Sequence, residues 1–533
     1  MAKQTPPTHT RKNAQAGPLL PPPGGVAIRM YRLGLGDCFL LAFAGKKARP
    51  VYMLIDCGVH FAQQEGKQNM ALVVDDLARA TEGHIDLVVA THEHADHLSG
   101  FVHHAKRFLN GDITIGRLWL AWTENDHDAD AARLRRGRVA AYDAIEAALH
   151  KLEQEAADSP ALAAMQQRLA AATGFFAIGV NGDVDEHEQQ HAAFISQLGL
   201  RSSKSVSGNE LALALLKRQA EEITFLDAGD QPIPLPGTNV ARAYVLGPPR
   251  DDALLNRSDP SGGDRHETYL SSAVGLHSFA AAVLQGLNHS GDGREQREIT
   301  YPFDQRYRRS YEWAADQPFF REHYGFNGFD RQGWRRIESD WLRAAEELAL
   351  HLDRHTNNTS LVLAIELGKP GQGPVLLFVG DAQVGNWLSW RSLKWRVGRR
   401  SLDITDLLGR TLVYKVGHHA SHNATLRRDD QGSDYGLELM PEGLIALIPV
   451  DQAAASKLPG WHMPYRKLYQ VLKRKTRGNI LRSDDGHDDS LPSPRTRAAR
   501  VPGVAGATWR CSTAKKTDGR PLFYDLLIDP GDT

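Results

Sequence analysis

The stretch Ile85-Asp-Leu-Val-Val-Ala-Thr-His-Glu-His-Ala-Asp-His-Leu-Ser-Gly100 decides how the rest of the chain is interpreted. Its apolar run over 87–90 is typical of a buried strand. Three imidazoles and a carboxylate follow directly after this run. In an extended chain, side chains two residues apart point the same way, so His92 and His94 can converge on one cation.

Asp96 and His97 come where the chain is expected to turn into a helix, and they can face a second cation. Imidazole and carboxylate together are zinc ligands, and they also suit iron or manganese. The structural alternative is a surface histidine cluster at the end of a strand. Because a strand that feeds this ligand spacing rarely arises by chance, a site for two metal ions is the favoured interpretation.

The composition limits the remaining possibilities. The 533 residues are 41% hydrophobic, so they can form more than one domain or one core with large insertions. Lys and Arg number 63 against 64 for Asp and Glu, so any binding to nucleic acid or acidic membranes must be local. Three cysteines are too few for a disulfide framework, and no apolar run reaches the ~18 residues that span a bilayer. A soluble cytoplasmic protein without membrane partners is therefore expected.

The N-terminal part alternates in the way that strands and helices require. Strand patterns cover 26–31, 33–41 (with a glycine-rich turn) and 50–58, and apolar residues at helical spacing cover 69–81. Another strand is expected over 113–122. The predicted order is β-β-β-α-β, the histidine motif, then α and β.

Two later stretches also place polar residues at the ends of predicted strands. The first, Val375-Leu-Leu-Phe-Val-Gly-Asp-Ala-Gln383, ends in a carboxylate, Asp381, which has two oxygens to offer to two cations. The second, Leu412-Val-Tyr-Lys-Val-Gly-His-His-Ala-Ser-His422, ends in neighbouring imidazoles. Spacing alone does not settle whether His418 or His419 binds metal.

The His-x-His-x-Asp-His motif resembles the central motif of the metallo-β-lactamase superfamily. The later stretches, together with Asn-Asn-x-Ser-Leu-Val-Leu from Asn357, resemble the ComEC-like branch of that superfamily. The resemblance covers 26–122, 240–250 and 357–486. It implies an α/β fold, an αββα sandwich with a di-metal site along one edge, to which this chain adds a large, mainly helical insertion.

The expected domain organisation follows from this resemblance. Residues 1–25 are expected to be disordered, because they are rich in Pro, Thr, Gly and Gln. A metallo-β-lactamase-fold domain would cover 26–490, with insertions at about 123–238 and 251–350. A linker and a C-terminal hairpin would cover 491–533.

The resemblance also implies functional residues. The metal ligands would be His92, His94, Asp96, His97, Asp381 and His419. The first two would hold one ion and Asp381 would bridge two ions, zinc first, with manganese or iron as alternatives. Asp96 would also orient a hydroxide, and His418 would contact the substrate or act as an acid. Asp37 and Asp56 would orient the ligands.

Many members of the superfamily add a third histidine to the first ion. In this chain that residue would lie between His97 and Asp381. The candidates, none of them in a recognisable motif, are His266, His277, His289 and His355. Without such a residue, the first ion would have fewer protein ligands.

The resemblance implies a metal-dependent hydrolase, and phosphodiester hydrolysis is the first hypothesis because the branch includes DNA-uptake nucleases and phosphodiesterases. The alternatives are a hydrolase of esters, lactones or amides, and a metal-binding interaction protein without catalysis. The expected partner is a phosphoester-containing substrate, with nucleic acid as one candidate. The surface of the helical insertion could form a homodimer contact, but a helical cap packed on its own core is the favoured interpretation.

Two basic clusters bear on a nucleic-acid substrate. Residues 390–400 and 473–477 are rich in Arg and Lys and could follow a phosphate backbone. Trp390 or Trp395 could stack on a base. Solvated helix faces are the alternative explanation.

Overall fold

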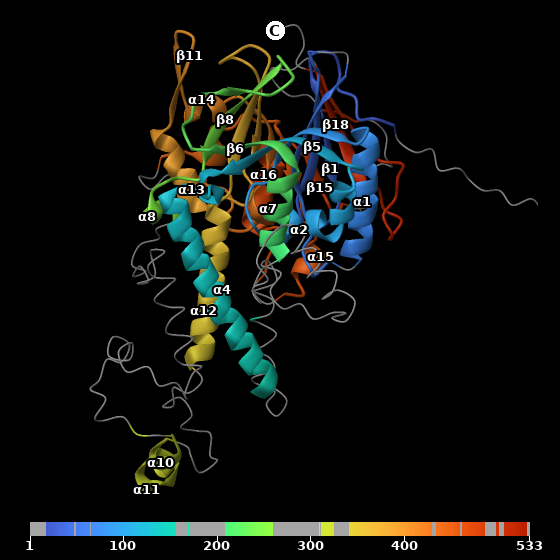
Figure 1. The fold of residues 1–533 in the computed structure, drawn as a ribbon. Helices are drawn as coiled ribbons and strands as arrows, with labels where there is room; N and C mark the ends of the chain where they lie inside the picture. Colours follow the sequence, from blue (N-terminus) through green and yellow to red (C-terminus); the bar gives the residue numbers. More distant parts are fainter. Residues whose placement is uncertain are drawn as a thin grey trace, which may run out of the picture. The chain divides into compact units, whose positions relative to one another are not determined.

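The computed structural model divides into two compact units (Figure 1). One comprises Met1–Ala131, Gly174–His266 and Arg354–Thr533, and the other comprises Ala132–Thr173 and Glu267–Asp353. The structure describes residues 17–46, 49–63, 65–155, 169, 208–258, 309, 311–324, 340–428, 433–458, 461–485, 497–499 and 506–529.

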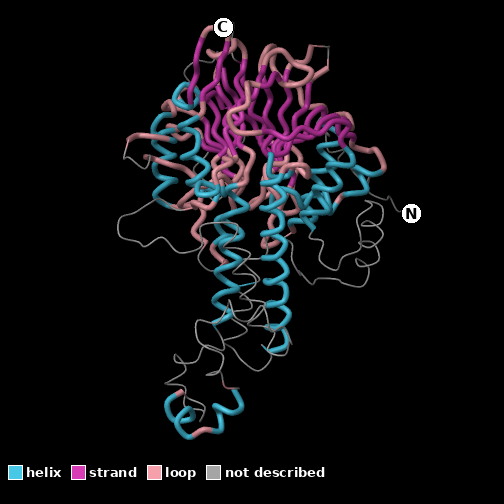
Figure 2. Tube along the Cα trace, turned by 60° about the vertical axis from the view of Figure 1, so that its left-hand side comes forward, coloured by secondary structure: helices cyan, strands magenta, loops and turns pink. Residues whose placement is uncertain are grey.

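The first unit is mixed α/β, and its strands, drawn in magenta, gather together (Figure 2). One of its sheets has nine strands in the order β16-β17-β18-β1-β2-β3-β4-β5-β6. Its strands are β1 (Val26–Tyr31), β2 (Cys38–Phe43), β3 (Val51–Cys57), β4 (His84–Val89), β5 (Thr114–Ala121), β6 (Ala220–Leu226), β16 (Arg497–Ala499), β17 (Gly506–Cys511) and β18 (Phe523–Asp529). Pairing is antiparallel from β16 to β3 and parallel from β3 to β6. The C-terminal hairpin β17–β18 therefore extends this sheet through β1.

The second large sheet has the order β15-β14-β13-β10-β9-β8-β7. Its strands are β7 (Ile233–Pro234), β8 (Ala241–Gly247), β9 (Val362–Leu367), β10 (Val375–Phe378), β13 (Thr411–Lys415), β14 (Ile445–Ile448) and β15 (Ile480–Arg482). Strands β10, β13, β14 and β15 run parallel, whereas β7 to β10 are antiparallel. A separate hairpin joins β11 (Lys394–Val397) to β12 (Arg400–Asp403).

Three apolar clusters form the core of this unit. One draws on both large sheets and includes Leu87 of β4 and Leu447 of β14. A second joins the first sheet to α1 (Gly66–Ala80), α2 (Ala95–His103) and α7 (Gly208–Gln219). A third joins the second sheet to α13 (Val384–Ser389), α14 (Ile404–Leu408) and α16 (Arg466–Lys475). Each sheet therefore packs one face on the other sheet's residues and the opposite face on helices.

Short elements complete the first unit: α3 (Ala105–Leu109), η1 (Trp122–Glu124), α8 (Asp252–Leu255), η6 (Trp390–Ser392), η7 (His418–Ala420), η8 (Gly436–Leu439) and α15 (Gln452–Ala455). The second unit is described by helices: α10 (Tyr311–Asp316), α11 (Pro318–His323) and most of α4 (Ala129–Glu155) and α12 (Asp340–Asn358), whose residues up to Ala131 and from Arg354 belong to the first unit. α4 buries Leu134, Arg138, Ala141, Ile145 and Ala148. This spacing of three and four residues is that of an amphipathic helix.

The structure departs from the predicted elements in two places. In the stretch from Asn357 that resembles the ComEC-like branch, the strand begins only at Val362, because α12 continues to Asn358. Within the interval 123–238, α7 and β6 belong to the first unit, and β6 pairs in parallel with β5. Within the same interval of the mainly helical insertion, residues 156–168 and 170–207 lie outside the described residues.

Parallel strands carry the polar stretches to common edges, because their carboxyl ends lie side by side. Val89 of β4 pairs with Ile55 of β3, so Asp56 and the histidine motif emerge together. Phe378 of β10 pairs with Lys415 of β13, so the Asp381 and His419 loops also emerge together.

Candidate metal centre

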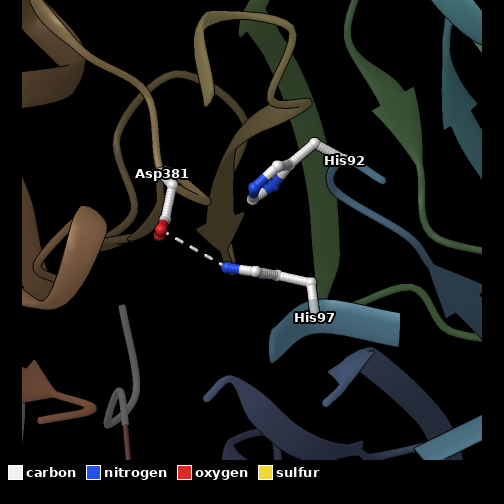
Figure 3. A group of neighbouring side chains, drawn as sticks. All are labelled: His92, His97 and Asp381. Carbon is white, nitrogen blue, oxygen red and sulfur yellow. Dashed lines mark ion pairs between the residues drawn. The ribbon is translucent and has the colours of Figure 1, made fainter. Parts of the chain in front are cut away.

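The motif leaves β4 and reaches α2 through five residues, with His94 in extended conformation at the N-cap of the helix. His92 comes from the connecting loop, His97 from the first turn of α2, and Asp381 from the loop after β10. Figure 3 shows the side chains of these three residues pointing toward one another. All three are buried, so their polar atoms face each other away from solvent.

Three groups of ligand atoms, each within 4.8 Å of one another, lie in this region, and one of them consists of Asp37, Asp56 and His97. Of the other two, the first consists of His92, His97 and Asp381, and the second of Asp96, Asp381 and His419. Asp381 belongs to both of these groups. The structure thus brings residues from distant parts of the chain into two overlapping sites that share one carboxylate.

His94 adjoins the first group through His92. The Nε2 atom of His92 lies 3.0 Å from Nδ1 of His94. Two nitrogen ligands of a tetrahedral zinc ion, each about 2.0–2.1 Å from the metal, are about 3.3 Å apart. Burial lowers the pKa of His94 to about 3, so its ring is neutral and has a lone pair for a cation.

Asp56 fixes the orientation of His97. It is the extra residue of a β-bulge between β2 and β3 and has a left-handed φ of 56°. Its carboxylate accepts hydrogen bonds from Nδ1 of His97 (2.7 Å), the Thr91 amide (2.8 Å) and the Thr91 hydroxyl (2.7 Å). With the proton on Nδ1, the Nε2 lone pair of His97 faces the cluster.

Asp56→Asn is expected to weaken zinc binding by about 10- to 100-fold, because the amide cannot hold His97 as the carboxylate does. The fold should persist, since asparagine tolerates a left-handed backbone and keeps one oxygen for Thr91. Competition with a chromophoric chelator measures the affinity. Asp86→Asn is the matched control, because Asp86 also accepts a backbone N–H, that of Tyr52. Equal zinc affinity in both variants would contradict this role of Asp56.

Glycine permits the close approach that brings Asp56 and the motif together. A Cβ on Gly58 would lie 2.2 Å from the Asp96 carbonyl carbon and 2.3 Å from the His97 nitrogen. These separations are far below van der Waals contact. Only glycine therefore fits where the loop after β3 crosses the start of α2.

Asp96 and His419 form the other side of the cluster. The Nε2 atom of His419 lies 2.8 Å from Oδ2 of Asp96, and its Nδ1 donates to the Pro449 carbonyl at 2.6 Å. A proton on Nδ1 leaves the Nε2 lone pair directed at the carboxylates. Burial alone would raise the pKa of Asp96, but His97 and His419 hold that pKa well below its usual range.

The loop that carries His419 is conformationally strained. His418, His419 and Ala420 have φ angles of 43°, 50° and 63°. Left-handed backbone costs non-glycine residues roughly 1–2 kcal/mol each, and such strain collects at functional sites. The loop is held by two backbone donors: His418 donates to Asp381 Oδ1 at 2.9 Å, and Tyr465 donates to the Ala420 carbonyl at 2.8 Å.

His418 lies outside both groups of ligand atoms. Its Nδ1 is 2.9 Å from the Ser421 hydroxyl and 3.3 Å from the Gln383 amide nitrogen. Ser421 donates to Asn423 Oδ1 at 2.8 Å, so its oxygen can accept from Nδ1–H of His418. The Gln383 amide nitrogen, by contrast, can only donate to Nδ1, so the two partners require opposite roles of this atom.

The donor set fits divalent cations. Among the described residues, His97 Nε2, Asp96 Oδ1 and Asp381 Oδ2 have no hydrogen-bond partner although they are fully buried. Buried polar atoms are normally paired, so a converging set without partners indicates that something else satisfies them. Imidazole nitrogens and carboxylate oxygens are ligands that zinc, manganese and iron accept.

Several polar residues near the cluster were not predicted from the sequence. Lys415 contacts Asp37 and Asp381. Buried His60 has a pKa lowered to about 4, chiefly by burial and against the opposing effect of Asp96. Lys415 ends an otherwise apolar strand, and His60 closely follows Asp56. In the sequence, these positions were the only indications that the two residues lie near the site.

The other sequence candidates lie outside these groups of ligand atoms or outside the described residues. His355 is buried near the end of α12, four residues before Thr359, whereas His266, His277 and His289 lie outside the described residues. The expectation that Trp390 or Trp395 stacks on a base is wrong. Both indoles are in the core of the first unit, 0% and 1% exposed, because they pack against the second sheet.

The segment that carries the motif has a counterpart among known families. Residues 34–168 match the model of the Metallo-beta-lactamase superfamily. The match contains His92, His94, Asp96 and His97, whereas Asp381 and His419 lie beyond it. No curated protein and no solved structure matches the chain. The family match and the buried donor groups together support a metal-dependent hydrolase.

In the part of the chain that the structure describes, no helix has the length and apolar character needed to cross a membrane.

Proposed function

We propose that this chain is a phosphodiesterase whose site holds two divalent cations. The observation that carries the proposal is the position of Asp381. Its Oδ2 atom is buried, has no hydrogen-bond partner among the described residues and belongs to a carboxylate shared by two donor groups. Sharing one carboxylate is how two-metal sites place their ions close together.

The proposed ligand set is His92, His94, Asp96, His97, Asp381 and His419. The first two histidines would hold one ion, Asp96, His97 and His419 would hold the other, and Asp381 would serve both. His419 is preferred over His418 because its Nε2 lies 2.8 Å from Asp96 Oδ2 and 4.0 Å from Asp381 Oδ2. Zinc is the first choice of metal, given the nitrogen-rich donor set.

When bound, two such cations lower the pKa of a shared water toward neutrality and polarise the bond to be cleaved. The chain's own residues then orient the reactants. Asp96 has Oδ2 beside His419 Nε2, at 2.8 Å, whereas its Oδ1 has no hydrogen-bond partner among the described residues and would accept a hydrogen bond from the attacking water. His418, held by Ser421, is the imidazole of this loop that contacts the substrate.

The preference for phosphodiesters rests on the stretches around Asp381 and His419 that resemble the ComEC-like branch. On the same resemblance we propose that the fold is the αββα sandwich of the superfamily. A basic helix supports an anionic substrate. α16 starts immediately after Tyr465, whose backbone amide donates a hydrogen bond to the carbonyl of Ala420, the residue after His419. Its exposed cations are Arg466, Lys467, Lys473 and Arg474.

The proposal is tested with two chromogenic substrates, bis-p-nitrophenyl phosphate and p-nitrophenyl butyrate. Zinc- or manganese-loaded protein is expected to hydrolyse the phosphodiester, and chelation should abolish that activity. Hydrolysis of the butyrate ester alone would move the substrate class to carboxylic esters. Metal-loaded protein that cleaves neither substrate would contradict the proposal.

A further inference from the structure

Lys415 is a buried cation at the edge of the proposed metal centre. It ends β13 and is 1% exposed. Its ammonium group donates to the Gly380 carbonyl at 2.8 Å and to Asp381 Oδ1 at 3.1 Å, and it also contacts Asp37 Oδ2. An ammonium has three N–H donors, so these three oxygens use its full capacity.

Asp37 ties this lysine to the histidine motif. The Asp37 amide donates to the Asp96 carbonyl at 2.9 Å, and the Asp37 carbonyl accepts from the Gly58 amide at 3.0 Å. Asp37 precedes β2 of the nine-stranded sheet, whereas Lys415 and Asp381 lie at the ends of strands of the other sheet. The Asp37–Lys415 pair therefore joins the two halves of the donor set.

The two oxygens of Asp381 have different surroundings. Oδ1 accepts from Lys415 and from the His418 amide at 2.9 Å. Oδ2 lies 3.5 Å from His97 Nε2 and 4.0 Å from His419 Nε2. Rotation of the carboxylate would break both bonds to Oδ1, so Oδ2 is kept on the side of the imidazoles.

A cation beside a metal centre opposes metal binding unless its charge is compensated. Asp37 supplies that compensation, because it forms a buried ion pair with Lys415. The ammonium group lies among two carboxylates and a carbonyl oxygen, and the Asp37–Lys415 ion pair as a whole is neutral, so it can hold Asp381 without repelling cations.

We propose that Lys415, neutralised by Asp37, is a positioning residue that fixes the Asp381 carboxylate with Oδ2 facing the metal centre. This inference rests on the proposed two-metal site. A ligand that is free to rotate must be ordered when the metal binds. Loss of a residue that orients a ligand typically weakens metal affinity by about 10- to 100-fold.

The test compares full-length Lys415→Met, the double variant Asp37→Asn/Lys415→Met and wild type. Zinc affinity is measured by chelator competition, and the thermal unfolding of the metal-free proteins is measured separately. Lys415→Met leaves the Asp37 charge buried and unpaired, so its metal-free form should unfold at a lower temperature. The double variant removes both charges and should recover much of that stability.

Zinc affinity separates positioning from a purely structural role. Both variants are expected to bind zinc about 10- to 100-fold more weakly than wild type, even though the double variant is stable. In cobalt-loaded protein, the d–d absorption bands of the double variant should also shift. Lys516→Met is the matched control, since Lys516 has a side chain only 8% exposed and pairs with Asp518 at 3.2 Å.

Native zinc affinity in the double variant would overturn the inference, because affinity would then have recovered together with stability. Wild-type protein that binds no divalent cation at saturating concentration would instead overturn the metal centre, and this inference with it. Zinc binding by wild type, with weakened binding in the double variant and unaltered binding in Lys516→Met, supports the positioning role.

Discussion

Asp381→Asn is expected to reduce bound metal from two ions to one or none and to lower phosphodiester hydrolysis by about 1,000-fold or more. A neutral amide cannot supply the Oδ2 charge that both donor groups share. Losses of this size follow when a group that acts in concert with the rest of a site is removed. Mass spectrometry for metal and initial rates on bis-p-nitrophenyl phosphate give the two readouts.

The substitution is nearly isosteric, so the fold should survive it. The side-chain oxygen that the new amide retains can still accept from the His418 amide, as Oδ1 of Asp381 does in wild type. Asp112→Asn is the matched control, because Asp112 is a half-exposed carboxylate that pairs with Arg107 at 3.4 Å. Full metal content and full turnover in Asp381→Asn would show that the bridging assignment is wrong.

Removal of metal is expected to lower the unfolding temperature by on the order of 10 °C. A ligand at about 1,000 times its Kd stabilises a protein by about 4 kcal/mol per site. Each kcal/mol changes Tm by about 2 °C or slightly less in a domain above roughly 200 residues. Without metal, the negative charges of the buried carboxylates Asp96 and Asp381 also repel each other, because no cations neutralise them.

Calorimetry on metal-loaded protein, with and without chelator, measures this change. Zinc added back should restore the original Tm. In Asp381→Asn the chelator should cause a much smaller change, which separates metal loss from nonspecific effects of the chelator. An identical Tm before and after verified metal removal would contradict a metal centre in the core of the first unit.

The sequence predicted the elements whose signals are local. Strands β3, β4, β10 and β13 are short apolar runs, and each leads into polar residues, so the strands and the site residues could be predicted together. Helix α7 and strand β6 were missed because Gln219 of the helix is followed at once by Ala220 of the strand. No glycine or proline marks that change.

The long-range features of the site could not be predicted. In the sequence, Lys415 resembles any charged residue at the end of a strand. Its partner Asp37 lies far away in sequence, near the N-terminus. Their pairing depends on how the two sheets meet, which no local pattern records. The tryptophans show the reverse error: Trp390 and Trp395 stand among Arg and Lys residues in sequence, yet both are buried.

The central claim is tested most directly by counting metal ions. Protein purified without chelator and equilibrated with zinc is analysed by inductively coupled plasma mass spectrometry. Wild type is expected to contain two ions per chain, and the combination of His92→Ala with Asp381→Asn at most one. Wild type with no bound ion, or the double variant with two, would contradict a metal centre built from these residues.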